Sequence, residues 1–110
     1  MSLGGLERQA WPIVPFNTVE VSAAYPGATP EEVEESIVVK IEEQVEALAD
    51  VKAVESLAAP GIASVRVELN TGAEIDEAMD EIESAVGLIH SLPGAAERPK
   101  FREMNNPARA

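Results

Sequence analysis

The sequence predicts an α+β domain in which two helices cover one face of a four-stranded antiparallel sheet. Short segments such as 18–24 and 62–69 alternate apolar and polar residues, as half-buried strands do. Two longer segments, about 30–49 and 74–92, repeat apolar residues every three or four positions, which indicates helices that bury one face. The resulting order is β-α-β-β-α-β. Right-handed crossovers then place both helices on the same side of the sheet, in the ferredoxin-like arrangement.

The composition fits one folded domain and excludes several classes of protein. The chain has 110 residues and no cysteine, so it forms no disulfide and no thiolate metal site. Its 20 acidic and 8 basic residues give a net charge of -12, which disfavours nonspecific binding to nucleic acid or anionic membranes. No apolar run approaches the roughly 20 residues of a membrane span. We expect a leader and extended arm at 1–17, the folded unit at 18–104 and a truncated tail at 105–110.

The junction between the first strand and the first helix carries the most complete local signals. Gly27 suits a turn that needs a positive φ. Thr29 fits an N-cap, Pro30 the first helical position and Glu32 the third position of a capping box. These signals predict a helix over about 30–49. Its buried stripe would be Val33, Ile37, Ile41, Val45 and Leu48.

The second half predicts a hairpin, a helix and a last strand. Strands at 51–58 and 62–69 flank Pro60-Gly61, so they should pair antiparallel. A helix over about 74–92 would stop at Pro93-Gly94, and a strand at 99–104 would turn Phe101 inward. The stripe of this helix would be Ile75, Met79, Ile82, Val86 and Ile89.

Strand alternation separates two faces of the predicted sheet. We expect the helices to cover the apolar face, formed by Val19, Val21, Val65, Val67 and Phe101. The opposite face has no helix to cover it and would carry Glu20, Ser22, Ser64, Arg66, Lys100 and Arg102.

The residues offer little for catalysis or for a cofactor. His90 is the only histidine, so a zinc site would have carboxylates alone, which is an unusual donor set. Asp76, Asp80 and Glu83 share one side of the second helix and are interpreted as a solvated face rather than a metal site. An acylphosphatase-like enzyme would need an arginine in the loop after the first strand, and 25–28 contains no base. The residues alone therefore favour a binding or scaffolding module, not an enzyme, with no cofactor.

The sequence also resembles a known transporter family along most of its length. The run VEVSAAYPGATPEEVEESI at 19–37, VRVEL at 65–69, IDEA at 75–78 and ERP at 97–99 keep the order and spacing of resistance-nodulation-division (RND) efflux transporters. The resemblance is to the acriflavine-resistance, hydrophobe/amphiphile type. It implies the first porter subdomain of a proton-driven multidrug antiporter, in the periplasm, within a protein of the inner membrane.

The resemblance implies partners and roles for particular residues. The partners would be the rest of the same transporter chain, two further copies in a homotrimer, a periplasmic adaptor, an outer-membrane channel and a small amphiphilic substrate. The second helix would line the trimer pore, with subunit contacts at Asp76, Asp80, Glu83 and Gly87. The open sheet face would form a wall of the substrate pathway, at Ser22, Ser64, Arg66 and Arg102. Its two arginines depart from better-known drug pumps, where this face is more often uncharged.

Two other interpretations remain open at this point. One is a free-standing ferredoxin-like regulatory module that binds a small ligand. The other treats the two arginines as surface bases that balance Glu20 and Glu68.

Overall fold

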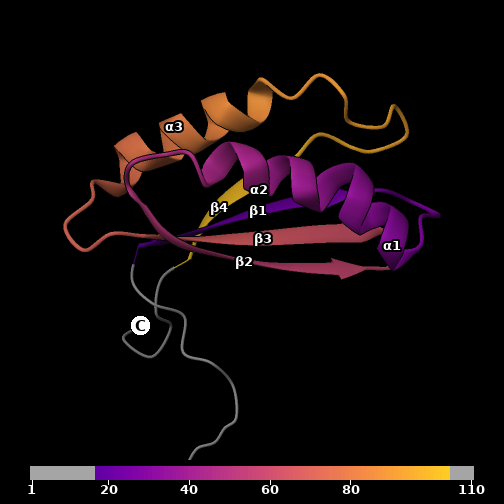
Figure 1. The fold of residues 1–110 in the computed structure, drawn as a ribbon, viewed down its shortest axis with the longest axis horizontal. Helices are drawn as coiled ribbons and strands as arrows, with labels where there is room; N and C mark the ends of the chain where they lie inside the picture. Colours follow the sequence, from indigo (N-terminus) through magenta and orange to yellow (C-terminus); the bar gives the residue numbers. More distant parts are fainter. Residues whose placement is uncertain (1–16, 105–110) are drawn as a thin grey trace, which may run out of the picture.

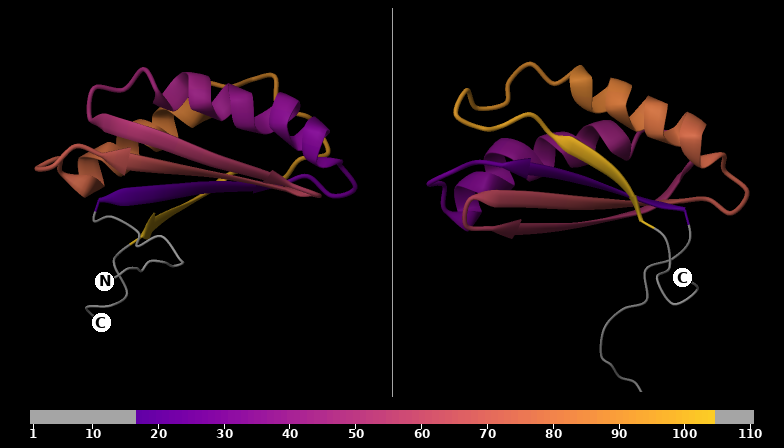
Figure 2. Two further views of the ribbon diagram at one scale, coloured as in Figure 1. Left: turned by 60° about the horizontal axis from the view of Figure 1, so that its bottom comes forward. Right: turned by 180° about the vertical axis from the view of Figure 1, so that it is seen from behind.

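The computed structural model describes residues 17–104, which form one antiparallel sheet with helices on a single face. The strands are β1 Thr18–Ala24, β2 Val51–Ala59, β3 Ile62–Leu69 and β4 Lys100–Met104. Their order in the sheet is β2-β3-β1-β4, as the ferredoxin-like prediction requires. Figures 1 and 2 show all helices of the described residues on one side of the sheet. The predicted fold class is therefore confirmed. The leader and arm expected at 1–17, except for Asn17, and the tail expected at 105–110 lie outside the described residues.

The predicted signals at the end of β1 are all present in the structure. Gly27 has a φ of 83°. The Thr29 hydroxyl accepts a hydrogen bond from the Glu32 backbone N–H at 3.1 Å, and the Thr29 N–H donates to Glu32 Oε1 at 2.9 Å. This capping box starts helix α1, Pro30–Val33. The same loop is tied to the β2–β3 turn, because the Gly61 N–H donates to the Ala28 carbonyl at 3.0 Å.

The first helical rod contains a π-helical segment that the sequence pattern did not predict. Helix α1 continues into η2, Glu34–Val38, and then α2, Val39–Val45. Four residues of an α-helix turn through about 400°. Apolar residues spaced four apart therefore shift by about 40° around the helix axis from each one to the next. A wider π turn offsets this shift, and it buries both Ile37 and Val38 completely.

The rod also ends at Val45, four residues before the predicted end at Ala49. The chain must return to pair Val51 with Leu69 on β3. Asn70 holds this return in place. Its backbone N–H donates to the Asp50 carbonyl at 2.8 Å, and its side-chain amide donates to the Ala49 carbonyl at 3.3 Å.

The second helix, α3, spans Ile75–Gly87 and is also shorter than predicted. The expected stop at Pro93-Gly94 was wrong. Glycine is a weak helix former, and the N–H groups of Leu88 and Ile89 bond to carbonyls only three residues back, which closes the helix early. Ile89 and Leu92 still pack against the core, but from the loop that follows the helix. Within residues 17–104, no helix combines the length and apolar character needed to cross a membrane.

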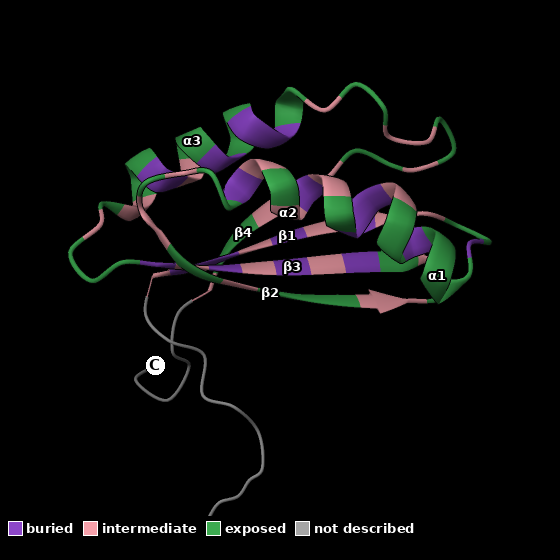
Figure 3. Ribbon diagram, viewed as in Figure 1, coloured by how far each residue is buried: buried purple, intermediate pink, exposed green. Residues whose placement is uncertain are grey.

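The core lies between the sheet and the helices, on the face that strand alternation predicted. Val19, Val21, Val65 and Val67 are fully buried, and Phe101 is half-buried against them. The alternation of buried and partly exposed residues is visible along β3 in Figure 3. The helices contribute fully buried side chains at Val33, Ile37, Val38, Ile41, Val45 and Ile82.

Candidate functional site

The face of the sheet that carries no helix brings the four predicted pathway residues together. The pairing of β1 with β3 and β4 places Ser22 opposite Ser64, and Glu20 opposite both Arg66 and Arg102. Residues two apart on a strand point to the same face, so these side chains share one surface. We call it the open face. Two rows cross it: Lys100, Ser22, Ser64 and Leu57 in one, and Arg102, Glu20, Arg66 and Glu55 in the next.

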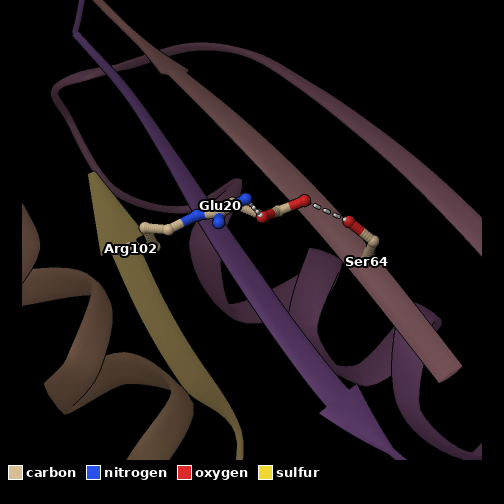
Figure 4. A network of polar contacts seen from close by, with 3 residues as sticks. All are labelled: Glu20, Ser64 and Arg102. Atoms are coloured by element: carbon tan, nitrogen blue, oxygen red, sulfur yellow. Dashed lines mark hydrogen bonds and ion pairs between the residues drawn. The ribbon is translucent and has the colours of Figure 1, made fainter. Parts of the chain in front are cut away.

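Glu20 is the centre of a polar network on this face (Figure 4). Arg102 Nη2 lies 2.6 Å from Glu20 Oε1, and the Ser64 hydroxyl donates to Glu20 Oε2 at 2.8 Å. The Glu20 side chain is only 16% exposed, whereas that of Arg102 is 70% exposed. Both carboxylate oxygens are therefore engaged by neighbouring strands. Sequence reasoning placed Glu20 on this face but omitted it from the site, because its position between two arginines depends on the strand register, which local patterns do not determine.

Arg66 and Lys100 are cations of the open face whose side chains bond to nothing in the described part of the chain. Register places Arg66 between Glu20 and Glu55, but neither carboxylate forms an ion pair with it. The Lys100 ammonium likewise has no hydrogen bond or ion pair to residues 17–104. Both side chains therefore keep their hydrogen-bond donors available.

The open face is hollowed into two shallow depressions that meet at Ser64. The larger, about 510 Å³, lies over β1 and β4 and includes Ile62, which is 45% exposed. The smaller, about 290 Å³, lies over β2 and β3 and includes Leu57, which is 66% exposed. Exposed aliphatic side chains thus sit beside charged ones, a combination that suits an amphiphilic molecule. The larger is lined by Glu20, Ser22, Ile62, Ser64, Lys100, Phe101 and Arg102; the smaller by Glu55, Ser56, Leu57, Ser64 and Arg66.

The second predicted set lies on the opposite side of the molecule. Asp76, Asp80, Glu83 and Gly87 are all exposed on α3. Asp80 also lines a depression of about 450 Å³ between α2 and α3, where Leu88 is 66% exposed. Sequence reasoning missed this depression, because the helix predicted over 74–92 included Leu88 with no role assigned to it. Across residues 17–104, no three His, Cys, Asp or Glu side chains are grouped to hold a metal ion.

Comparison with known proteins identifies the family. The chain matches the AcrB/AcrD/AcrF family over residues 1–110, which is its whole length. It therefore belongs to this family of RND efflux transporters, and the resemblance seen in the sequence is confirmed.

Curated relatives and a solved structure agree with this assignment. The chain is 30% identical over 96 residues to the multidrug resistance protein MdtC of Cronobacter sakazakii (strain ATCC BAA-894), covering 86% of this chain and 9% of that protein. MdtC of Klebsiella pneumoniae (strain 342) gives the same identity and coverage. The crystal structure of a heavy metal efflux pump shares the fold with a TM-score of 0.76 at 23% identity, covering 90% of this chain and 10% of that one. The chain thus spans about a tenth of the length of these relatives.

Proposed function

We propose that this chain is a periplasmic porter subdomain of a proton-driven RND multidrug efflux transporter. The observation that carries the proposal is the open face, a continuous polar and aliphatic surface with two depressions and no covering element within residues 17–104. A sheet with helices on one face needs a partner for the other face or must keep it polar. In a transporter, that face would form one wall of the substrate pathway, with contributions from Ser22, Ser64, Arg66 and Arg102.

The helical side would serve assembly rather than transport. We assign α3 to the pore at the axis of a homotrimer, with Asp76, Asp80, Glu83 and Gly87 as candidate contacts between subunits. All four are exposed, which leaves them available for such contacts. The remaining partners would be the rest of the transporter chain in the inner membrane, a periplasmic adaptor and an outer-membrane channel. The subdomain would move as a rigid unit when the pathway opens and closes. It would neither transport nor act as an enzyme by itself.

The proposal is tested by filling the point where the two depressions meet. Ser64→Trp is introduced into the transporter that carries this segment, in a bacterial host without its own RND pumps. Efflux of N-phenyl-1-naphthylamine, a neutral amphiphilic dye, is followed by fluorescence. We expect the bulky ring to lower the efflux rate by about tenfold, because Trp would occupy both depressions. The matched control is Ser91→Trp, an exposed position after α3, which should leave efflux unchanged.

A second variant separates obstruction from misfolding. Ser22→Trp fills the larger depression without removing either partner of the hydrogen bond between Ser64 and Glu20. Normal dye efflux in both open-face variants, at equal amounts of transporter in the membrane, would contradict the proposal. The proposed function requires that the unaltered transporter export this dye or an anionic counterpart of it. Export of neither dye would contradict the proposed function.

A further inference from the structure

We propose that the open face selects amphiphilic anions: small molecules that join one carboxylate, sulfonate or phosphate group to an apolar body. This inference rests on the proposed function and adds a substrate class to it.

The first support is the uneven distribution of charge over the two sides of the molecule. The chain carries 8 basic residues against 20 acidic ones. Along the helices α1 to α3, acidic residues dominate the exposed surface, and Lys40 is the only base. Strand residues provide half of all the bases in the chain, namely Lys52, Arg66, Lys100 and Arg102. An anion approaching this protein would therefore be repelled by the helical side and tolerated only at the sheet.

The second support is that two of the three acidic groups on the open face are already paired. Glu20 accepts from Arg102 and from Ser64. Glu68 lies 3.6 Å from the Lys52 ammonium. A cationic substrate would have to displace Arg102 or Lys52 to reach either carboxylate. The remaining acid, Glu55, is exposed at the edge of the sheet.

The third support is the placement of the two cations that have no partner in the described chain. Lys100 lies in the larger depression together with the exposed Ile62. Arg66 lies in the smaller depression together with the exposed Leu57. Each depression thus offers one available cation beside one aliphatic side chain. An anionic group can bind the cation through charge-assisted hydrogen bonds while its apolar body covers the aliphatic side chain.

The experiment compares two dyes that share an aromatic frame and differ in charge. 1-Anilinonaphthalene-8-sulfonate carries a sulfonate, and N-phenyl-1-naphthylamine is its uncharged counterpart. Efflux of both is measured in cells that express the transporter carrying this segment, either unaltered or with Arg66→Gln and Lys100→Gln combined. Losing two exposed charge contacts should slow sulfonate efflux by about fivefold. Efflux of the neutral dye should change by less than about twofold.

Arg98→Gln is the matched control. It removes one exposed positive charge from the loop before β4, and Arg98 lines neither depression, so efflux of both dyes should remain unchanged. The inference is overturned if the double variant slows both dyes equally or neither dye. It is also overturned if the unaltered transporter exports only the neutral dye. In these cases, a lower efflux rate in the Ser64→Trp variant would still support the proposal that the open face forms a wall of the substrate pathway. Failure to export either dye would instead overturn the proposed function as well.

Discussion

Gly27 occupies the turn between β1 and α1 with a φ of 83°, a backbone conformation that residues with a Cβ atom rarely adopt. No heavy atom lies within 4 Å of the position that a Cβ would take, so a side chain there meets open space. The requirement for glycine is therefore conformational rather than steric. This distinction makes the turn a useful place to measure backbone strain by itself.

We predict that Gly27→Val lowers the free energy of unfolding by about 1–3 kcal/mol, because valine would be forced into the left-handed region. Thermal unfolding followed by circular dichroism measures the effect. The control is Gly94→Ala, at a glycine without a positive φ and equally open space, which should leave the melting temperature almost unchanged. Equal melting temperatures for Gly27→Val and the unaltered chain would show that the turn relaxes without strain.

The first helical rod shows at the scale of an element how local packing departs from a regular helix. Its π-helical segment closes through a hydrogen bond from the Val39 N–H to the Glu34 carbonyl, five residues back. The wider turn directs Ile37 and Val38 into the core together, while Val39 remains 36% exposed. Adjacent valines in the same rod thus differ sharply in burial.

This difference predicts unequal effects for the same substitution at neighbouring positions. Val38→Ala should cost about 2 kcal/mol of stability, because it removes fully buried methyl groups and leaves a cavity. Val39→Ala should cost less than about 0.5 kcal/mol, since its side chain is partly in water and alanine favours the helix. Urea unfolding of both variants gives the comparison. Similar midpoints for the two variants would mean that the π turn does not persist in solution.

The elements also show what sequence patterns can and cannot define. The strands were predicted within one residue, because alternation and the turn glycines Gly27 and Gly61 mark their ends. Helix ends were predicted too late, because Leu48, Ile89 and Leu92 continue the apolar period although they pack from loops. Apolar residues spaced four apart are also typical of a regular α-helix. The π turn therefore cannot be recognised from the sequence without knowing the sheet on which the helix packs.

Strand alternation also made part of the candidate site predictable. Alternation alone fixes which side of each strand a residue occupies, so the open face could be assigned from the sequence. The contact between Glu20 and Arg102 joins residues 82 positions apart and depends on the register of β1 with β4. Local patterns do not determine such a register.

At the scale of the whole molecule, acidic residues are concentrated on the helical side. Helix α3 carries like charges four residues apart, at Asp76 and Asp80 and again at Glu77 and Glu81, and such pairs destabilise a helix. The single lysine of the helical rods, Lys40, instead donates to the Ser91 carbonyl at 2.6 Å. The acidic side chains of the helical layer therefore repel one another.

We predict that sodium chloride stabilises the chain. Raising its concentration from 10 to about 150 mM shortens the screening length from about 30 to about 8 Å, which weakens this repulsion. The melting temperature should rise by about 4 °C, the shift that roughly 1 kcal/mol produces in a domain of this size. Glu81→Gln removes one repulsive pair and should reduce the gain. A melting temperature that falls with added salt would show that attractive ion pairs dominate instead.

The π-helical segment has a consequence for comparing members of this family. One residue fewer between positions 34 and 38 would close that turn as ordinary α-helix, and the flanking apolar stripes would still meet the sheet. Chain length can therefore vary here by a single residue while the flanking stripes keep facing the sheet, although the core would no longer receive both Ile37 and Val38. When family sequences are aligned, a one-residue gap within this stretch is structurally sound, whereas the same gap within β1 or β3 would reverse the orientation of every side chain beyond it.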